Sequence, residues 1–198
     1  MAHTNLEVPP MTPSLSAKDA PDLSLVVPMY NEESAIDSFF KAVRPVLDQI
    51  GLPYEIVCVN DGSRDATLAA LTGIARKDAR VRIIDLSRNF GKEAALTAGL
   101  DLARGRAVVP IDADLQEPPE LIALMVKHWQ EGYDVVLARR SGRHSDTALK
   151  RGSARLFYRF LRVMSDVDIP ENVGDFRLMD RAVVDALRRL PERSRFMK

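Results

Sequence analysis

The 198-residue sequence lacks the features that mark several common classes of protein. It has no excess of one charge, because 28 lysine and arginine residues balance 28 aspartate and glutamate residues, and this argues against general nucleic-acid binding. It has a single cysteine, Cys58, so no disulfide can form within the chain and we expect a reducing compartment. Cys58 lies in an apolar run, where a buried and unreactive side chain is favoured over a reactive thiol.

Long apolar runs and the usual glycine-rich phosphate loops are also missing. No stretch approaches the roughly 18 consecutive apolar residues of a membrane span, and residues 1–22 are polar and rich in proline, without the apolar core of a signal peptide. We therefore expect a chain that is soluble as given and that begins with a flexible leader at 1–22. Neither GxxxxGK[ST] nor a GxGxxG after the first apolar run is present, so a phosphate site would be built from a metal and basic side chains.

What is present is a regular alternation of strand-like and helix-like segments. Apolar and often β-branched runs indicate strands at 23–28, 54–59, 81–86, 107–111 and 134–138. Segments with a hydrophobic period of about 3.6 residues indicate helices at 34–50, 65–77, 92–104 and 119–131. This alternation predicts one α/β domain over residues 23–198, with a mostly parallel sheet covered by helices on both faces.

The chain changes character after residue 138. A basic, irregular stretch leads into a helix-like segment at 145–164, in which basic residues such as Lys150 and Arg155 alternate with apolar ones. Two interpretations of this basic amphipathic helix stay open: a solvated charged face on a core-packed helix, or contact with an anionic membrane surface or a phosphate. A short strand at 174–179 and a last helix at 181–190 close the domain.

Polar side chains gather directly after the strands, where an open parallel sheet binds its ligands. The strand ends carry NEE, NDGS, RNFGK and DADLQ, in chain order. Any one of these could be turn or cap chemistry, which is how we interpret Ser34, Ser63 and Asp65. Four such loops at one edge are better explained by a shared cation, because carboxylates brought together repel one another.

Asp112 and Asp114 give the sharpest signal of a metal site. In an extended segment, residues i and i+2 point to the same side, so we expect both carboxylates to face one spot and Gln116 to continue the alternation. Mg²⁺ or Mn²⁺ prefers such oxygen ligands, together with water and phosphate oxygens. We assign Glu117 and Glu120 to the first turn of the next helix, outside the site. The candidates for holding phosphate are the basic residues Lys92, Arg139, Arg140, Lys150 and Arg151.

Several stretches together resemble the family 2 glycosyltransferases of the GT-A fold, in the branch that includes dolichyl-phosphate mannose synthase and the bacterial polyprenyl-phosphate glycosyltransferases. The matching stretches are VVPMYNEE, VNDGSRDAT, LSRNFGKEAALTAGLDLARG, IDADLQEPPELI and ENVGDFRLMDR. The resemblance implies a UDP- or GDP-linked sugar donor, a polyprenyl phosphate acceptor, and transfer with inversion at the sugar carbon.

The resemblance also implies roles for particular residues. The base and ribose of the donor would contact Pro28, Tyr30, Asn31, Glu32 and Asp61. The metal and the diphosphate would lie against Asp112, Asp114 and Gln116, and phosphates of donor or acceptor would contact Arg140 and Arg151.

A lipid phosphate suits the basic character of the chain after residue 138. A sugar hydroxyl needs a general base before it attacks, whereas a phosphate monoester, with a second pKa near ~6, is largely dianionic at neutral pH and needs cations to place it. The pair Arg139 and Arg140 and the helix at 145–164 could supply them. Asp175 is the best remaining carboxylate for orienting the acceptor or acting as a base, and a cap or an ion pair with Arg177 is the alternative.

Members of this branch usually continue past a stretch like SRFMK into transmembrane helices, which this chain does not have as given. We expect donor and metal binding without that part, at the cytoplasmic face of a membrane that the basic helix contacts. A homo-oligomer stays open. So do two other classes of function: a haloacid-dehalogenase-like phosphatase, whose nucleophile motif is also Asp-x-Asp after a strand but wants Thr or Val where Gln116 stands, and a non-catalytic nucleotide-binding module.

Overall fold

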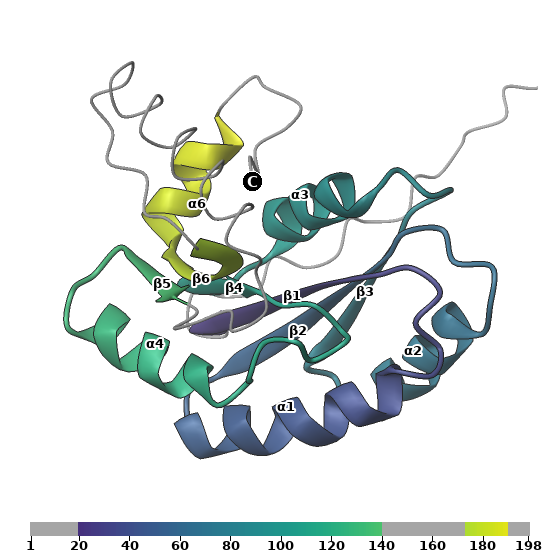
Figure 1. Ribbon diagram of the computed structural model, residues 1–198, viewed down its shortest axis with the longest axis horizontal. Helices are drawn as coiled ribbons and strands as arrows, with labels where there is room; N and C mark the ends of the chain where they lie inside the picture. The colour runs from purple at the N-terminus through teal and green to yellow at the C-terminus, as the bar shows by residue number, and fades with distance from the viewer. Residues whose placement is uncertain (1–19, 140–172, 190–198) are drawn as a thin grey trace, which may run out of the picture.

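A computed structural model describes residues 20–139 and 173–189 of the chain, and there strands and helices alternate as the sequence predicts (Figure 1). The strands are β1 (Leu23–Met29), β2 (Tyr54–Asn60), β3 (Val81–Asp85), β4 (Ala107–Pro110), β5 (Val135–Arg139) and β6 (Val173–Asp180). The helices are α1 (Ile36–Ile50), α2 (Thr67–Ala75), α3 (Lys92–Leu102), α4 (Leu121–Gln130) and α6 (Arg181–Arg188). Residues 1–19 of the leader expected at 1–22, and the basic helix expected at 145–164, lie outside the described residues.

The strands form one six-stranded sheet in the order β3-β2-β1-β4-β6-β5. The pairs β1 with β2, β1 with β4 and β2 with β3 are parallel, whereas β6 runs antiparallel to both β4 and β5. The expectation of a mostly parallel sheet is therefore confirmed, with one reversed strand inserted between two strands of the common direction. Because β6 is reversed, its first residues lie at the edge where the other strands end.

The sheet is covered on both faces, which explains why its central strands are apolar on both sides. Alternate residues of β1 illustrate this, since Leu25 and Val27 pack in the layer with α1, α2 and α4, whereas Val26 packs in the layer with α3 and α6. Figure 1 shows α1, α2 and α4 on one side of the sheet and α3 and α6 on the other. Helix α3 lies close to the sheet because Gly99 has no side chain: a Cβ there would come within 2.3 Å of Val26 Cγ1.

A buried polar network fixes the opposite edge of the sheet, where the strands begin. Glu55 of β2 is 5% exposed. It accepts hydrogen bonds from Ser24 Oγ at 2.7 Å, from the Arg104 backbone N–H at 2.7 Å and from Arg82 Nη1 at 2.9 Å. The Glu55 carboxylate therefore joins β1, β3 and the α3–β4 connection at the edge of the sheet opposite the carboxyl ends of the parallel strands.

Candidate active site

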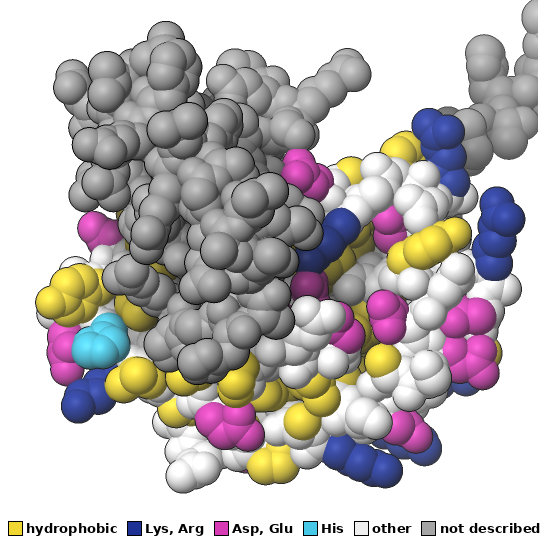
Figure 2. All heavy atoms as spheres, in the orientation of Figure 1, with side chains coloured by type: hydrophobic (Ala, Val, Ile, Leu, Met, Phe, Trp, Pro, Cys, Tyr) yellow, Lys and Arg dark blue, Asp and Glu magenta, His cyan; other side chains and the backbone are white. Residues whose placement is uncertain are grey.

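A cleft of about 280 Å³ opens at the carboxyl edge of the central strands, where ligand sites of open α/β sheets are found. The loops that follow β1, β2, β3 and β4 all contribute to it. Its lining residues are Pro28, Met29, Tyr30, Glu32, Asp61, Asn89, Gly91, Lys92, Ala95, Asp112, Ala113 and Asp114. Figure 2 shows acidic and basic side chains meeting beside a hollow on this face. Of the predicted site residues, the structure thus brings together Pro28, Tyr30, Glu32, Asp61, Lys92, Asp112 and Asp114.

Three carboxylates gather at one end of this cleft. Asp112, Asp114 and Glu117 each offer an oxygen atom, and these atoms lie within 4.8 Å of one another. Three carboxylate oxygens at this spacing suit Mg²⁺ or Mn²⁺, which prefer oxygen ligands and tolerate several waters among them. The donor set therefore fits the cation that the sequence predicts.

The cluster forms for a different reason from the one expected. Strand β4 ends at Pro110, and residues 113 and 114 form a turn, so Asp112 and Asp114 do not lie on an extended strand. Leu115 then takes a left-handed conformation with φ 57°, which redirects the chain. Helix α4 begins only at Leu121, so placing Glu117 in the first helical turn was wrong. The left-handed Leu115, rather than the alternation of a strand, brings the Glu117 carboxylate to those of Asp112 and Asp114.

Gln116 lies beside the cluster without lining the cleft. Its side chain is exposed, and its backbone N–H donates to Asp114 Oδ1 at 3.1 Å, which helps to hold that carboxylate. Ligation of a metal by the Gln116 amide stays a prediction.

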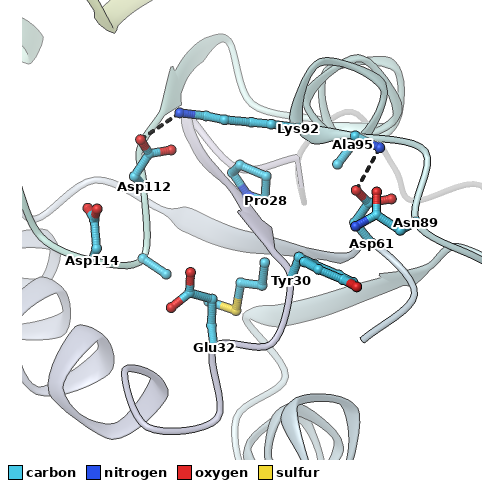
Figure 3. A pocket seen from close by; sticks show the side chains of 12 residues that line it. Pro28, Tyr30, Glu32, Asp61, Asn89, Lys92, Ala95, Asp112 and Asp114 are labelled. Atoms are coloured by element: carbon cyan, nitrogen blue, oxygen red, sulfur yellow. Dashed lines mark hydrogen bonds and ion pairs between the residues drawn. The ribbon is translucent and has the colours of Figure 1, made fainter. Parts of the chain in front are cut away.

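At the acidic end of the cleft, carboxylates lie close enough to repel one another, and Lys92 is the basic residue that lines the cleft within the described part of the chain. Burial, reinforced by the carboxylates of Asp114, Asp112 and then Asp65, raises the pKa of Glu32 above its ordinary value. Lys92, at the start of α3, places its Nζ 2.6 Å from Asp112 Oδ2. Figure 3 shows the Lys92 side chain reaching from α3 toward Asp112, with Asp114 and Glu32 on the same side of the cleft.

Asp61 lies at the other end of the cleft, beside Asn89 (Figure 3). It is only 2% exposed, and its two carboxylate oxygens accept hydrogen bonds from the backbone N–H groups of Phe90 at 2.7 Å and Gly91 at 2.9 Å. Gly62 lets the two loops touch: its φ is 63°, and a Cβ would come within 2.3 Å of the Arg88 carbonyl carbon. Asp61 therefore fixes the β3–α3 loop that carries Asn89 and Lys92.

Asn89 is a lining residue that we did not single out from the sequence. It stands among the polar residues after β3, so its position after a strand was the available signal.

Asn31 lies outside the lining residues and fastens one loop to another. Its Oδ1 accepts from the Arg64 backbone N–H at 2.8 Å, and its own N–H donates to Ser63 Oγ at 3.0 Å. Next to it, Glu32 N–H donates to Thr67 Oγ1 at 2.9 Å. These contacts hold the β1–α1 loop in place, and with it the cleft residues that the loop carries.

Ser63 and Asp65, which we had assigned to capping, take part in this fastening of loops. Asp65 accepts from Thr67 N–H at the start of α2, as a cap would, and also from Glu33 N–H in the β1–α1 loop.

The remaining predicted residues belong to the later part of the chain. The backbone of Arg139 ends β5, and that of Asp175 lies near the start of β6, so both positions fall at the carboxyl edge. Arg140 and Arg151 lie outside the described residues. Cys58 is buried, as expected, and burial raises the pKa of its thiol to about 12.

Comparison with solved structures identifies the fold. The mannosyltransferase of Pyrobaculum calidifontis in complex with GDP-Man and Mn²⁺ superposes with a TM-score of 0.56 at 24% identity, over 85% of this chain and 47% of that one. Glucosyl-3-phosphoglycerate synthase of Mycobacterium tuberculosis in complex with UDP gives 0.57 at 24% identity, over 87% and 64%. The fold is that of the GT-A glycosyltransferases.

Comparison with known sequences identifies the family. Residues 24–188 match the family described as Glycosyl transferase family 2, and the chain belongs to it. An uncharacterised glycosyltransferase of Synechocystis is 52% identical over 177 residues, which is 89% of this chain and 56% of that protein. The bactoprenol glucosyl transferase of Shigella phage SfV is 51% identical over 176 residues, 89% and 57% respectively.

The chain spans little more than half the length of each of these two relatives. Within residues 20–139 and 173–189, no helix has the length and apolar character needed to cross a bilayer. Membership of a glycosyltransferase family also removes the ground for the phosphatase alternative, which rested on Asp112 and Asp114 alone.

Proposed function

We propose that the chain is the donor-binding and catalytic domain of an inverting, metal-dependent enzyme that transfers a sugar from a UDP- or GDP-linked donor to a polyprenyl phosphate. The observation that carries the proposal is the cluster of Asp112, Asp114 and Glu117 at one end of a cleft that also contains Lys92. A cleft with cation ligands at one end and Asp61 and Asn89 at the other suits a nucleoside diphosphate, which has a charged end and a polar base.

The metal would be Mg²⁺ or Mn²⁺, held by Asp112 and Asp114 with Gln116 or Glu117 beside them. When bound, it would offset the negative charge of the diphosphate leaving group. Lys92 would add a positive charge on the facing side of the cleft. Pro28, Tyr30 and Asp61 would contact the base and ribose, and Asn31 supports their loops rather than lining the cleft.

The acceptor would be a lipid phosphate, as the relative named bactoprenol glucosyl transferase suggests. An acceptor phosphate oxygen would form the new bond to the sugar carbon on the face opposite the breaking bond to the diphosphate oxygen, which inverts that carbon. The phosphate is already anionic, so Arg139, Arg140 and Arg151 would position it rather than take its proton. Asp175 would orient the acceptor at the start of β6.

With this donor and acceptor, the protein would act at the cytoplasmic face of a membrane, where the acceptor phosphate and the nucleotide sugars would meet. The basic segment at 145–164 would contact the lipid surface. A homo-oligomer is compatible with this arrangement.

A transfer assay tests the proposal. The chain is incubated with Mn²⁺, undecaprenyl phosphate in detergent micelles, and either labelled UDP-glucose or labelled GDP-mannose. We expect label to enter the organic phase with at least one donor, and Asp114→Asn to abolish this. Hydrolysis of the donor to free labelled sugar, with no label in the organic phase, would overturn the lipid phosphate as acceptor. If neither sugar transfer nor donor hydrolysis occurs and the nucleotide still binds, the chain is a non-catalytic nucleotide-binding module.

A further inference from the structure

Lys92 is the only basic residue among the described residues that line the cleft, and it pairs with a carboxylate that the cation needs. The Nζ of Lys92 lies 2.6 Å from Asp112 Oδ2, and Asp112 belongs to the cluster with Asp114 and Glu117. The same carboxylate is therefore shared between a resident ammonium group and the proposed metal.

Two cations on one carboxylate oppose each other. A divalent ion at the cluster would lie close to the Lys92 ammonium as long as that group stayed on Asp112, and like charges at such a distance repel. The side chains of Lys92 and Asp112 are 44% and 34% exposed, so their pair is a weak one that solvent screens. A bound ion can therefore displace the ammonium group at modest cost.

The backbone at Lys92 is held by its neighbours, whereas its long side chain has many rotamers. Asp61 accepts from the Gly91 N–H, and the Gly91 carbonyl accepts from Ala95 N–H in the first turn of α3. The four-carbon stem of a lysine has many rotamers, so the ammonium group can leave Asp112 without any change of the loop. Lys92 lines the same cleft as Asp61 and the acidic cluster, and Figure 3 shows its side chain extending from α3 toward Asp112.

We infer that Lys92 couples metal binding to donor binding by exchanging partners: it neutralises Asp112 in the empty cleft and moves to the donor diphosphate when a divalent cation takes its place. The inference rests on the proposed function, because it requires the cation and the diphosphate in this cleft. Lys92 thereby weakens the binding of metal alone and strengthens the binding of nucleotide once metal is present. Because such coupling is reciprocal, each ligand raises the affinity for the other.

The test compares Lys92→Met with wild type in the full 198-residue chain, using calorimetric titration with Mn²⁺ alone and then with UDP and GDP at saturating Mn²⁺. Methionine keeps the length of the stem and removes the charge. We expect the variant to bind Mn²⁺ alone about twofold to fivefold more tightly, the gain from losing an exposed competing ion pair. We expect it to bind the nucleotide about tenfold or more weakly, since a charge-assisted contact to phosphate is lost.

Tighter Mn²⁺ binding together with weaker nucleotide binding distinguishes this role from a structural one, because a damaged fold would weaken the binding of both ligands. Lys127→Met, an exposed lysine near the end of α4, controls for the loss of one positive charge and should change neither affinity. Lys92→Arg keeps the charge and should retain the coupling. Unchanged or weaker Mn²⁺ binding by Lys92→Met would overturn the inference and leave the proposed function standing. A wild-type chain that binds neither Mn²⁺ nor nucleotide would overturn both.

Discussion

Replacing Asp61 by asparagine should destabilise the protein even without a ligand. The substitution keeps the shape of a side chain that is 2% exposed, but one oxygen becomes an NH₂ group. In the wild type the two oxygens accept from Phe90 N–H at 2.7 Å and Gly91 N–H at 2.9 Å. In the variant one of these N–H groups faces another donor, and the remaining bond is no longer made to a charged acceptor.

The size of the effect follows from these two bonds. A hydrogen bond to a charged group contributes about 1.5–3 kcal/mol, and a buried N–H without an acceptor costs about 1–3 kcal/mol. We expect Asp61→Asn to lower the free energy of unfolding by about 2–4 kcal/mol. For a domain of this size the corresponding loss in Tm is about 4–16 °C.

Urea denaturation followed by circular dichroism measures this change. Asp85→Asn is the matched control, because the exposed Asp85 carboxylate accepts one hydrogen bond from the described residues, from Asn60 Nδ2 at 2.7 Å. The control should cost about 1 kcal/mol or less. If Asp61→Asn were as stable as the wild type while nucleotide binding was lost, Asp61 would act on the nucleotide alone, and its assignment as the clamp of the β3–α3 loop would be refuted.

Three further predictions concern buried and acidic groups. Glu32→Gln should raise the urea midpoint at pH 7, because the raised pKa of Glu32 means that its ionisation opposes folding; the gain should vanish as pH falls below the ordinary value of 4.5, and a gain that persisted there would contradict this cause. Cys58 should react with a thiol reagent only after unfolding, since burial raises its pKa to about 12, and rapid labelling of the native chain would disprove its burial. Glu55→Ala should lower the free energy of unfolding by about 2–4 kcal/mol, because it leaves three donors without their acceptor, and a neutral effect in urea denaturation would show that they find other partners.

The sequence predicts the order and type of the described elements because their hydrophobic patterns are strong. Strand β2 is buried along its whole length, so its sequence does not resemble that of an amphipathic helix. Helix α1 has a clear apolar stripe, so its sequence does not resemble that of a strand. The direction and place of β6 were not predictable in the same way. A short strand carries no local signal of which neighbours it will pair with, and β6 enters between β4 and β5 through contacts distant in sequence.

The site was predictable in its chemistry and less so in its geometry. Asp112 and Asp114 could be found because two carboxylates directly after an apolar strand have few other uses. Glu117 could not, because its position depends on the left-handed conformation of Leu115, which nothing in the residue type favours. Asn31 shows the reverse case, since a polar residue after a strand can serve a neighbouring loop as readily as a ligand.

The central claim is that the acidic cluster holds a divalent cation on which nucleotide binding depends. Isothermal titration of the chain with UDP and GDP, with Mn²⁺ and after its removal by EDTA, measures this directly. Asp114→Asn removes one ligand, and Glu120→Gln, an exposed acid outside the cluster, is its control. We predict that at least one nucleotide binds with Mn²⁺, and that removing Mn²⁺ or substituting Asp114 weakens this binding by about tenfold or more, the loss of a charge-assisted contact. Equal binding by wild type and Asp114→Asn, with and without Mn²⁺, would contradict the claim.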